Sequence, residues 1–166
     1  MDLLGAIPEV EVLSGPTVAQ LMEDAGARLL NEAEHVYQAA SRVIMGAAAP
    51  GIVARQFRAS AMLLTSGDRA DLIAAALRFN DTAPPGEGLV AIVLADDLLP
   101  DAETLGAIGR ATVPVLAAAA PCYQLAIEIH ELLVKIRPTD QEKIDIVRTL
   151  IRENVDIQRI LDKMSL

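Results

Sequence analysis

Two hydrophobic patterns alternate along the middle of the chain. Short runs of aliphatic and β-branched residues predict strands, which we place at 41–46, 61–65, 88–94 and 113–117. Each run is followed by a segment with apolar residues at helical spacing, such as the LIAAALRF stretch that begins at Leu72. This alternation is typical of βαβ units around a parallel sheet. We therefore predict an α/β fold of three layers, in which helices flank a largely parallel sheet.

The segment before this region adds one helix and one strand. The apolar spacing after Ser14 predicts a short helix that is capped by Thr17 or Ser14 and ends at Gly26. The ARLL stretch at 27–30 then predicts a brief strand.

Two amphipathic helices close the chain. Thr139 and Glu142 have the spacing of a capping box, and Asp156 is suited to cap a last helix. The apolar positions of these helices are Ile144, Val147, Ile151, Ile157, Ile160, Leu161 and Met164. Because apolar surface is unfavourable in water, this stripe must be covered by the domain itself or by a second subunit.

Composition and charge limit the classes of partner. The 166 residues, of which 52% are hydrophobic, suffice for one domain spanning 1–166. A net charge of −9 repels phosphate backbones and anionic lipids, and 2% aromatic residues give no platform for base stacking. The start MDLLGAIPEVEV lacks the basic region of a signal peptide, and no apolar run is long enough to span a bilayer. We expect a cytoplasmic protein with neither a nucleic-acid nor a membrane partner.

Few residues have the spacing of metal ligands or nucleophiles. Cys122 is the single cysteine, and either has a lowered pKa at a helix start or serves in packing. His35 and His130 lie far apart in the sequence, without the spacing of a zinc site. Asp96 and Asp97 follow the third predicted strand. They either form a pair of metal ligands or, more simply, serve as polar loop residues and helix caps. We expect no bound metal.

The turn after the strand at 61–65 suggests an anion site. In Ser66-Gly67-Asp68-Arg69 the strand passes into a helix, whose first N–H groups and dipole suit an anion at the carboxyl edge of the sheet. Arg69 would supply charge to a phosphate or carboxylate, and Asp71 would orient Arg69 or accept a hydrogen bond from a sugar hydroxyl. Alternatively, Asp68 is only a cap or first-turn acid, and Arg69 and Asp71 are solvated.

Gly46 ends the first predicted strand at the same edge. It either lets the backbone approach a ligand or merely permits a turn. The chain has no P-loop motif, so nucleotide hydrolysis of that kind lacks its phosphate cradle. The candidate ligand-binding residues are thus Gly46, Ser66, Gly67, Asp68, Arg69 and Asp71, for a nucleotide or other phosphorylated small molecule.

Three cations cluster near the first closing helix in an otherwise acidic chain. Lys135, Arg137 and Lys143 either bind an anion, pair with acids across a dimer, or complement the dipole of the preceding helix. We favour an interface role over a ligand role.

Four stretches together resemble the DRTGG-domain family: VIMGAAAP, LLTSGDRADLIAAAL, GLVAIVLADDLLPD, and the long segment from VPVLAAAAPCYQ to DIQRIL. The resemblance covers about Gly15 to Leu161, which defines the expected core of the domain. Its most specific parts are GDRAD at 67–71 and KIRPTDQEKI at 135–144. The five letters of the family name do not occur as a run, and only Asp68-Arg69 match their start.

The resemblance implies a regulatory or assembly role. The family occurs within some phosphate acetyltransferases and CBS-domain pyrophosphatases and as stand-alone proteins, and its fold is similar to that of the N-terminal domain of HPr kinase. It implies a dimer that senses a ligand or acts through a partner protein, without catalysis. The alternatives are an enzyme related to phosphotransacetylase and acetyl phosphate metabolism, and a pure dimerisation scaffold.

Overall fold

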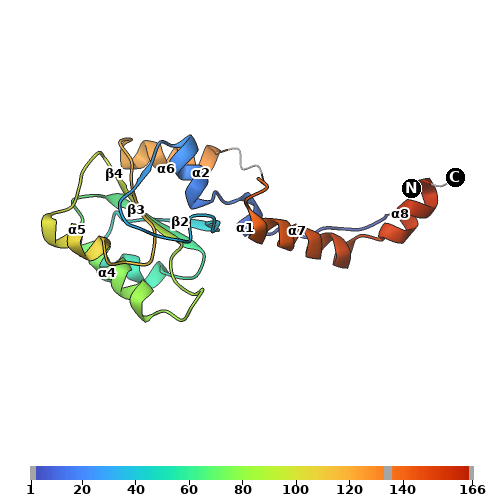
Figure 1. Cartoon of the computed structure of the whole chain (residues 1–166), viewed down its shortest axis with the longest axis horizontal. Helices are drawn as coiled ribbons and strands as arrows, with labels where there is room; N and C mark the ends of the chain where they lie inside the picture. Colours follow the sequence, from blue (N-terminus) through green and yellow to red (C-terminus); the bar gives the residue numbers. More distant parts are fainter. Residues whose placement is uncertain (1–2, 133–135, 165–166) are drawn as a thin grey trace.

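The computed structural model describes residues 3–132 and 136–164 of the chain. These residues form a compact body, residues 15–132, and an arm, residues 3–10 and 141–164, which projects from it (Figure 1). The short helix α1 (Glu11–Ser14) lies at the base of the arm.

A five-stranded sheet forms the centre of the body. Its strands are β1 (Arg28–Leu29), β2 (Arg42–Met45), β3 (Ala61–Ser66), β4 (Ala91–Ala95) and β5 (Val115–Ala117), in the order β1-β5-β4-β3-β2. β2 to β5 are parallel, and β1 pairs antiparallel with β5. All five residues of β4 are buried, as the unbroken apolar run predicts for a central strand covered on both faces.

Helices cover both faces of this sheet. One core contains Leu63, Ile92 and Leu94, which pack under α3 (Pro50–Val53), η1 (Ala54–Gln56), α4 (Ala70–Thr82) and α5 (Ala102–Ile108). The opposite core contains Met62 and Val93, beneath α2 (Val18–Asp24) and α6 (Cys122–Glu131). The predicted three-layer α/β class, with a largely parallel sheet, is confirmed.

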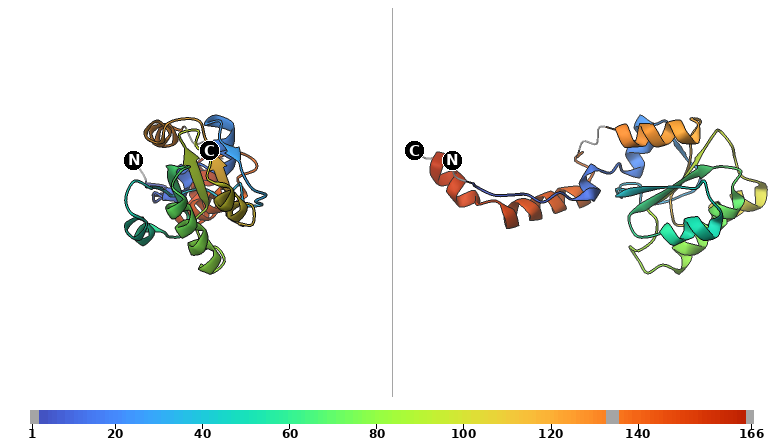
Figure 2. Two further views of the ribbon diagram at one scale, coloured as in Figure 1. Left: turned by 90° about the vertical axis from the view of Figure 1, so that its left-hand side faces the viewer. Right: turned by 180° about the vertical axis from the view of Figure 1, so that it is seen from behind.

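The arm consists of α7 (Gln141–Asn154), α8 (Ile157–Met164) and the extended residues 3–10 beside them (Figures 1 and 2). The Asp156 N–H donates to the carbonyl oxygen of Leu4, and Gly5 forms an antiparallel bridge with Val155. A Cβ on Gly5 would lie 2.3 Å from the carbonyl oxygen of Asn154, so glycine permits this close approach. The two ends of the described chain therefore lie together, far from the body.

The N-terminal caps of α2, α7 and α8 can be compared with those predicted from the sequence. Thr17 caps α2, as one of the two predicted caps, and forms a capping box with Gln20. The Asp156 carboxylate accepts the Arg159 N–H as predicted. The capping box predicted at Thr139 is wrong, because α7 begins one residue later with Asp140 at the N-cap. The Asp140 carboxylate instead accepts the N–H of Arg137, which fixes the turn before the helix.

Candidate functional site

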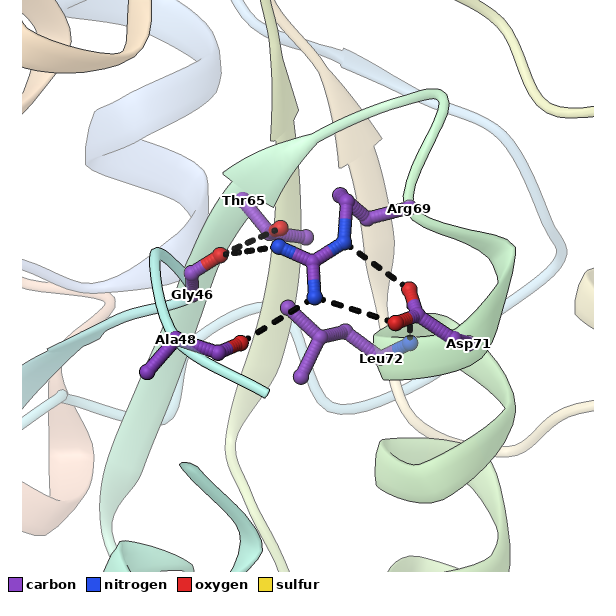
Figure 3. A network of polar contacts seen from close by, with 6 residues as sticks. All are labelled: Gly46, Ala48, Thr65, Arg69, Asp71 and Leu72. Atoms are coloured by element: carbon purple, nitrogen blue, oxygen red, sulfur yellow. Dashed lines mark hydrogen bonds and ion pairs between the residues drawn. The ribbon is translucent and has the colours of Figure 1, made fainter. Parts of the chain in front are cut away.

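The predicted anion site lies at the carboxyl edge of the sheet, where β3 passes into α4 (Figure 3). The guanidinium of Arg69 donates to both carboxylate oxygens of Asp71, at 2.9 and 3.0 Å. It also donates to the carbonyl oxygens of Gly46 at 3.2 Å and Ala48 at 3.1 Å. A guanidinium has five N–H donors, and these contacts use four of them. Arg69 thus ties the loop after β2 to the first turn of α4.

The first turn of α4 already holds an anion of its own. The Asp71 carboxylate accepts the N–H of Leu72 at 2.9 Å in addition to the bonds from Arg69. The hydrogen bond from Arg69, followed by that from Leu72, holds the pKa of Asp71 below its ordinary value. Asp71 reciprocally raises the pKa of Arg69. An added anion would therefore compete with Asp71 for these donors.

Close packing explains the two glycines of the candidate site. A Cβ on Gly67 would lie 1.7 Å from the carbonyl oxygen of Leu98, and one on Gly46 would lie 2.6 Å from the Thr65 Cβ. Among the described residues, the glycines with a positive φ are Gly26 and Gly86. Backbone conformation therefore does not require glycine at Gly46 or Gly67. Glycine serves here to let neighbouring segments approach.

The remaining candidates complete the same turn. The Ser66 carbonyl accepts the Arg69 N–H at 3.2 Å, and Asp68 is exposed near the guanidinium. The structure therefore gathers Gly46, Ser66, Gly67, Asp68, Arg69 and Asp71 at one edge, as predicted. Their role in binding a ligand stays a prediction, and the contacts of Arg69 and Asp71 with their neighbours show that these two side chains are more than solvated charges.

A second feature of this edge lies outside the candidate set. Asp96 and Asp97 adopt left-handed backbone conformations, with φ of 69° and 54°. The Asp96 carboxylate accepts the Cys122 N–H at the start of α6, at 3.0 Å. Burial, followed by the charge of Asp96, raises the pKa of the Cys122 thiol, so the suggestion of a lowered pKa is wrong. The sequence offered two separate signals for this contact, an Asp directly after a strand at Asp96 and a Pro at a helix start at Pro121, but nothing local that linked them.

The two described cations near α7 attach the arm to the body. Arg137 pairs with Glu23 and with Asp24, the latter at 3.2 Å, at the end of α2. The Lys143 side chain is buried, and its Nζ donates to the carbonyl oxygens of Gly15 at 2.5 Å and Leu13 at 3.5 Å. Desolvation lowers the pKa of Lys143. Lys135 lies outside the described residues, and an interface or anion role for the three stays a prediction.

The sequence did not reveal two cavities. One of about 480 Å³ lies at the amino edge of the sheet, lined by Ser60, Val90, Pro114 and residues of the 83–89 loop. Another of about 530 Å³, the β2–α6 groove, is lined by Glu11, Gly15, Arg42, Val43, Met45, Ile129 and His130. Both join segments distant in the sequence, so no local pattern could have indicated them.

Two further observations concern the described residues alone. None of their helices is both long and apolar enough to cross a bilayer. Within the same ranges, His, Cys, Asp and Glu side chains form no group of three that could hold a metal ion.

Comparison with known proteins adds relatives and a fold neighbour. The chain is 26% identical over 157 residues to a phosphate acetyltransferase of Pseudomonas putida, covering 93% of this chain and 22% of that protein. It is 24% identical to the enzyme of Pseudomonas aeruginosa, covering 94% of this chain and 22% of that one. The chain thus spans only about a fifth of the length of these curated relatives.

A solved structure shares the fold. It contains the CBS and DRTGG domains of the regulatory region of Clostridium perfringens pyrophosphatase, complexed with its activator diadenosine tetraphosphate. The TM-score is 0.57 at 13% identity, over 89% of this chain and 65% of that one. The family profile described as the DRTGG domain matches residues 20–132, which include the whole sheet and the turn at Arg69. The chain is therefore a member of the DRTGG-domain family.

Proposed function

We propose that this chain is a non-catalytic, cytoplasmic regulatory domain that forms a homodimer through its arm. In this role it binds a small anionic ligand, a nucleotide or another phosphorylated metabolite, and acts on a partner enzyme. Support for regulation comes from the family, because the related pyrophosphatase domains belong to a regulatory region complexed with a nucleotide activator.

The exposed apolar surface of the arm carries the proposal of a dimer. Ile151, Ile157 and Leu161 are 38%, 45% and 51% exposed, and Ile7 on the adjoining extended segment is 57% exposed. As described, neither of the two cores of the body includes a residue of the arm. A helix pair of this length gains most of its stability from packing of an amphipathic face, so a second chain is needed to cover it.

The ligand site proposed at the carboxyl edge would use the remaining donor of Arg69 and the first N–H groups of α4. An anion bound there would compete with Asp71 for the guanidinium and, by drawing Arg69 toward itself, would weaken the hydrogen bonds of Arg69 to the carbonyl oxygens of Gly46 and Ala48. Binding would thereby change the contact between β2 and α4.

A pure dimerisation scaffold is the second candidate. The observation that favours it is that Asp71, Gly46 and Ala48 already accept hydrogen bonds from four of the five N–H donors of Arg69, which explains the residues of the turn without a ligand.

Two measurements separate these functions. A thermal-shift screen of nucleotides, acyl phosphates and coenzyme A tests ligand binding, since a ligand at 100 times its Kd stabilises by about 2.7 kcal/mol. Sedimentation at tens of micromolar protein tests the dimer. A dimer without any ligand shift would support the scaffold, and a monomer would contradict both candidates.

A further inference from the structure

The arm differs from the rest of the chain in charge. Residues 141–164 carry five basic and five acidic side chains, and residues 3–10 add only Glu9, so the arm has a net charge of −1 and the remaining −8 comes from residues outside it. Two bodies therefore repel each other, whereas two arms can approach with little net repulsion. Among possible contacts between two copies, charge favours contact through the arms.

The lengths of α7 and α8 determine how far the arm reaches. α7 has 14 residues and α8 has 8, which correspond to about 21 Å and 12 Å of helix at 1.5 Å per residue. If two arms lie side by side in opposite directions, the α8 helix at the end of one arm reaches the base of the other. That base is where α1 meets β2 (Figure 1).

The β2–α6 groove lies at this base. β2 is the last strand in the sheet order, so one side of its backbone faces away from the sheet. The lining of the groove includes apolar Val43 and Met45, of which Met45 is 40% exposed, and charges of both signs at Glu11 and Arg42. α8 presents the matching combination: apolar Ile157 and Leu161 beside acidic and basic residues.

We propose that two copies of the chain pair their arms in antiparallel orientation, so that α8 of each copy lies in the β2–α6 groove of the other. This inference rests on the proposed homodimer and specifies its geometry. The contact is reciprocal, so it closes on two copies and does not propagate into a filament. The twofold axis crosses the middle of the arm, between Arg152 and Glu153, so that Ile151 faces its own counterpart.

Disulfide cross-linking in a Cys122→Ser background tests this geometry. Met45→Cys and Leu161→Cys, made as separate variants and mixed under reducing conditions, should form a linked dimer when a mild oxidant is added. Within one chain Met45 belongs to β2 of the body and Leu161 to α8, which lies at the far end of the arm (Figure 1), so the two are too far apart for a disulfide. Ile151→Cys alone should also link two copies, while Leu161→Cys alone should not.

The control is Glu103→Cys, an exposed position on α5 of the body, which should give no linked dimer. Each reduced variant is examined by sedimentation before oxidation. Linkage of Leu161→Cys to itself would indicate parallel arms and overturn the inference. Dimers without the Met45–Leu161 link would overturn the groove contact but leave the homodimer intact, and monomers of the Cys122→Ser parent would overturn both.

Discussion

The body and the arm use the same kinds of residue and reach different degrees of burial. In β3, Met62, Leu63 and Leu64 are fully buried, whereas Ile157 and Leu161 of α8 are about half exposed. The difference arises because a sheet offers two faces that helices can cover, while the arm pairs its helices with only one extended segment. Amphipathic periodicity therefore indicates that a face will be covered, but not which chain covers it.

Truncation of one leucine in each region is the sharpest test of this difference. Leu63→Ala should lower the free energy of unfolding by about 2–5 kcal/mol, because it leaves a cavity in a rigid core. The matched change Leu161→Ala should cost the isolated chain less than about 1 kcal/mol. Urea denaturation at low protein concentration measures both, and equal losses would show that the arm is packed as tightly as the body.

Two glycines test close packing within the body. Gly67→Ala should destabilise by about 1–3 kcal/mol, because its Cβ meets the backbone oxygen of Leu98, which cannot rotate away. Gly51→Ala in α3 is the control, because nothing lies within 4 Å of its Cβ position. There alanine should stabilise by about 0.4–1 kcal/mol by restricting the unfolded chain. Thermal unfolding gives both values, and a neutral Gly67→Ala would contradict the packing explanation.

A charge in the arm tests assembly. Ile151→Asp should convert the dimer to monomer or insoluble protein, since burying a carboxylate without a partner costs several kcal/mol. Thr149→Asp, an exposed position on the same helix, should leave the dimer intact. Sedimentation of both variants decides, and a dimeric Ile151→Asp would move the interface away from this face.

Arg69→Ala tests whether Arg69 only links the loop after β2 to α4 or also binds a ligand. In the structural role alone, Arg69 should contribute about 1 kcal/mol to the free energy of unfolding, since its ion pair with Asp71 is partly exposed. Its removal should raise the pKa of Asp71 toward the ordinary value, measurable by NMR titration. The lowered pKa of Asp71 stabilises the folded chain at pH values above the ordinary pKa, and this contribution is lost as the pH falls through the lowered pKa. Arg69→Ala lacks much of this contribution, so its free energy of unfolding should fall less on acidification than that of the parent.

The same variant also measures the ligand role. If Arg69 binds the ligand found in the screen, affinity should fall by about 10- to 150-fold, as expected for a charge-assisted hydrogen bond. Arg78→Ala, an exposed arginine further along α4, is the control. Unchanged affinity in Arg69→Ala would leave the residue with its structural role alone.

The smallest expected effect concerns the junction of body and arm. The pKa of Lys143 is lowered in the folded chain, so the unfolded chain binds more protons between this lowered pKa and the ordinary value. Stability should therefore rise with pH across that window, and Lys143→Met should remove this contribution. Lys163→Met, at an exposed lysine of α8, is the matched control. An unchanged pH dependence in Lys143→Met would contradict the assignment.

Much of the candidate site followed from local sequence. The strand ending at Ser66 and the helix after Arg69 placed the turn at the carboxyl edge, and the parallel strands brought Gly46 beside it. The partners of Arg69 could not be predicted, because two of them are backbone carbonyls of the loop after β2, more than 20 residues earlier. Backbone acceptors leave no trace in residue type.

The sequence by itself determined the order and type of the elements from α2 onward, the parallel arrangement of the central strands and the amphipathic faces of the closing helices. These features depend on local periodicity, which a chain carries wherever it folds. Only the tertiary structure decided that Gly67 must be small because of Leu98, that Lys143 is buried against Gly15, and that α7 and α8 project from the body. Each of these depends on segments distant in the chain, whose approach is set by the packing of the whole.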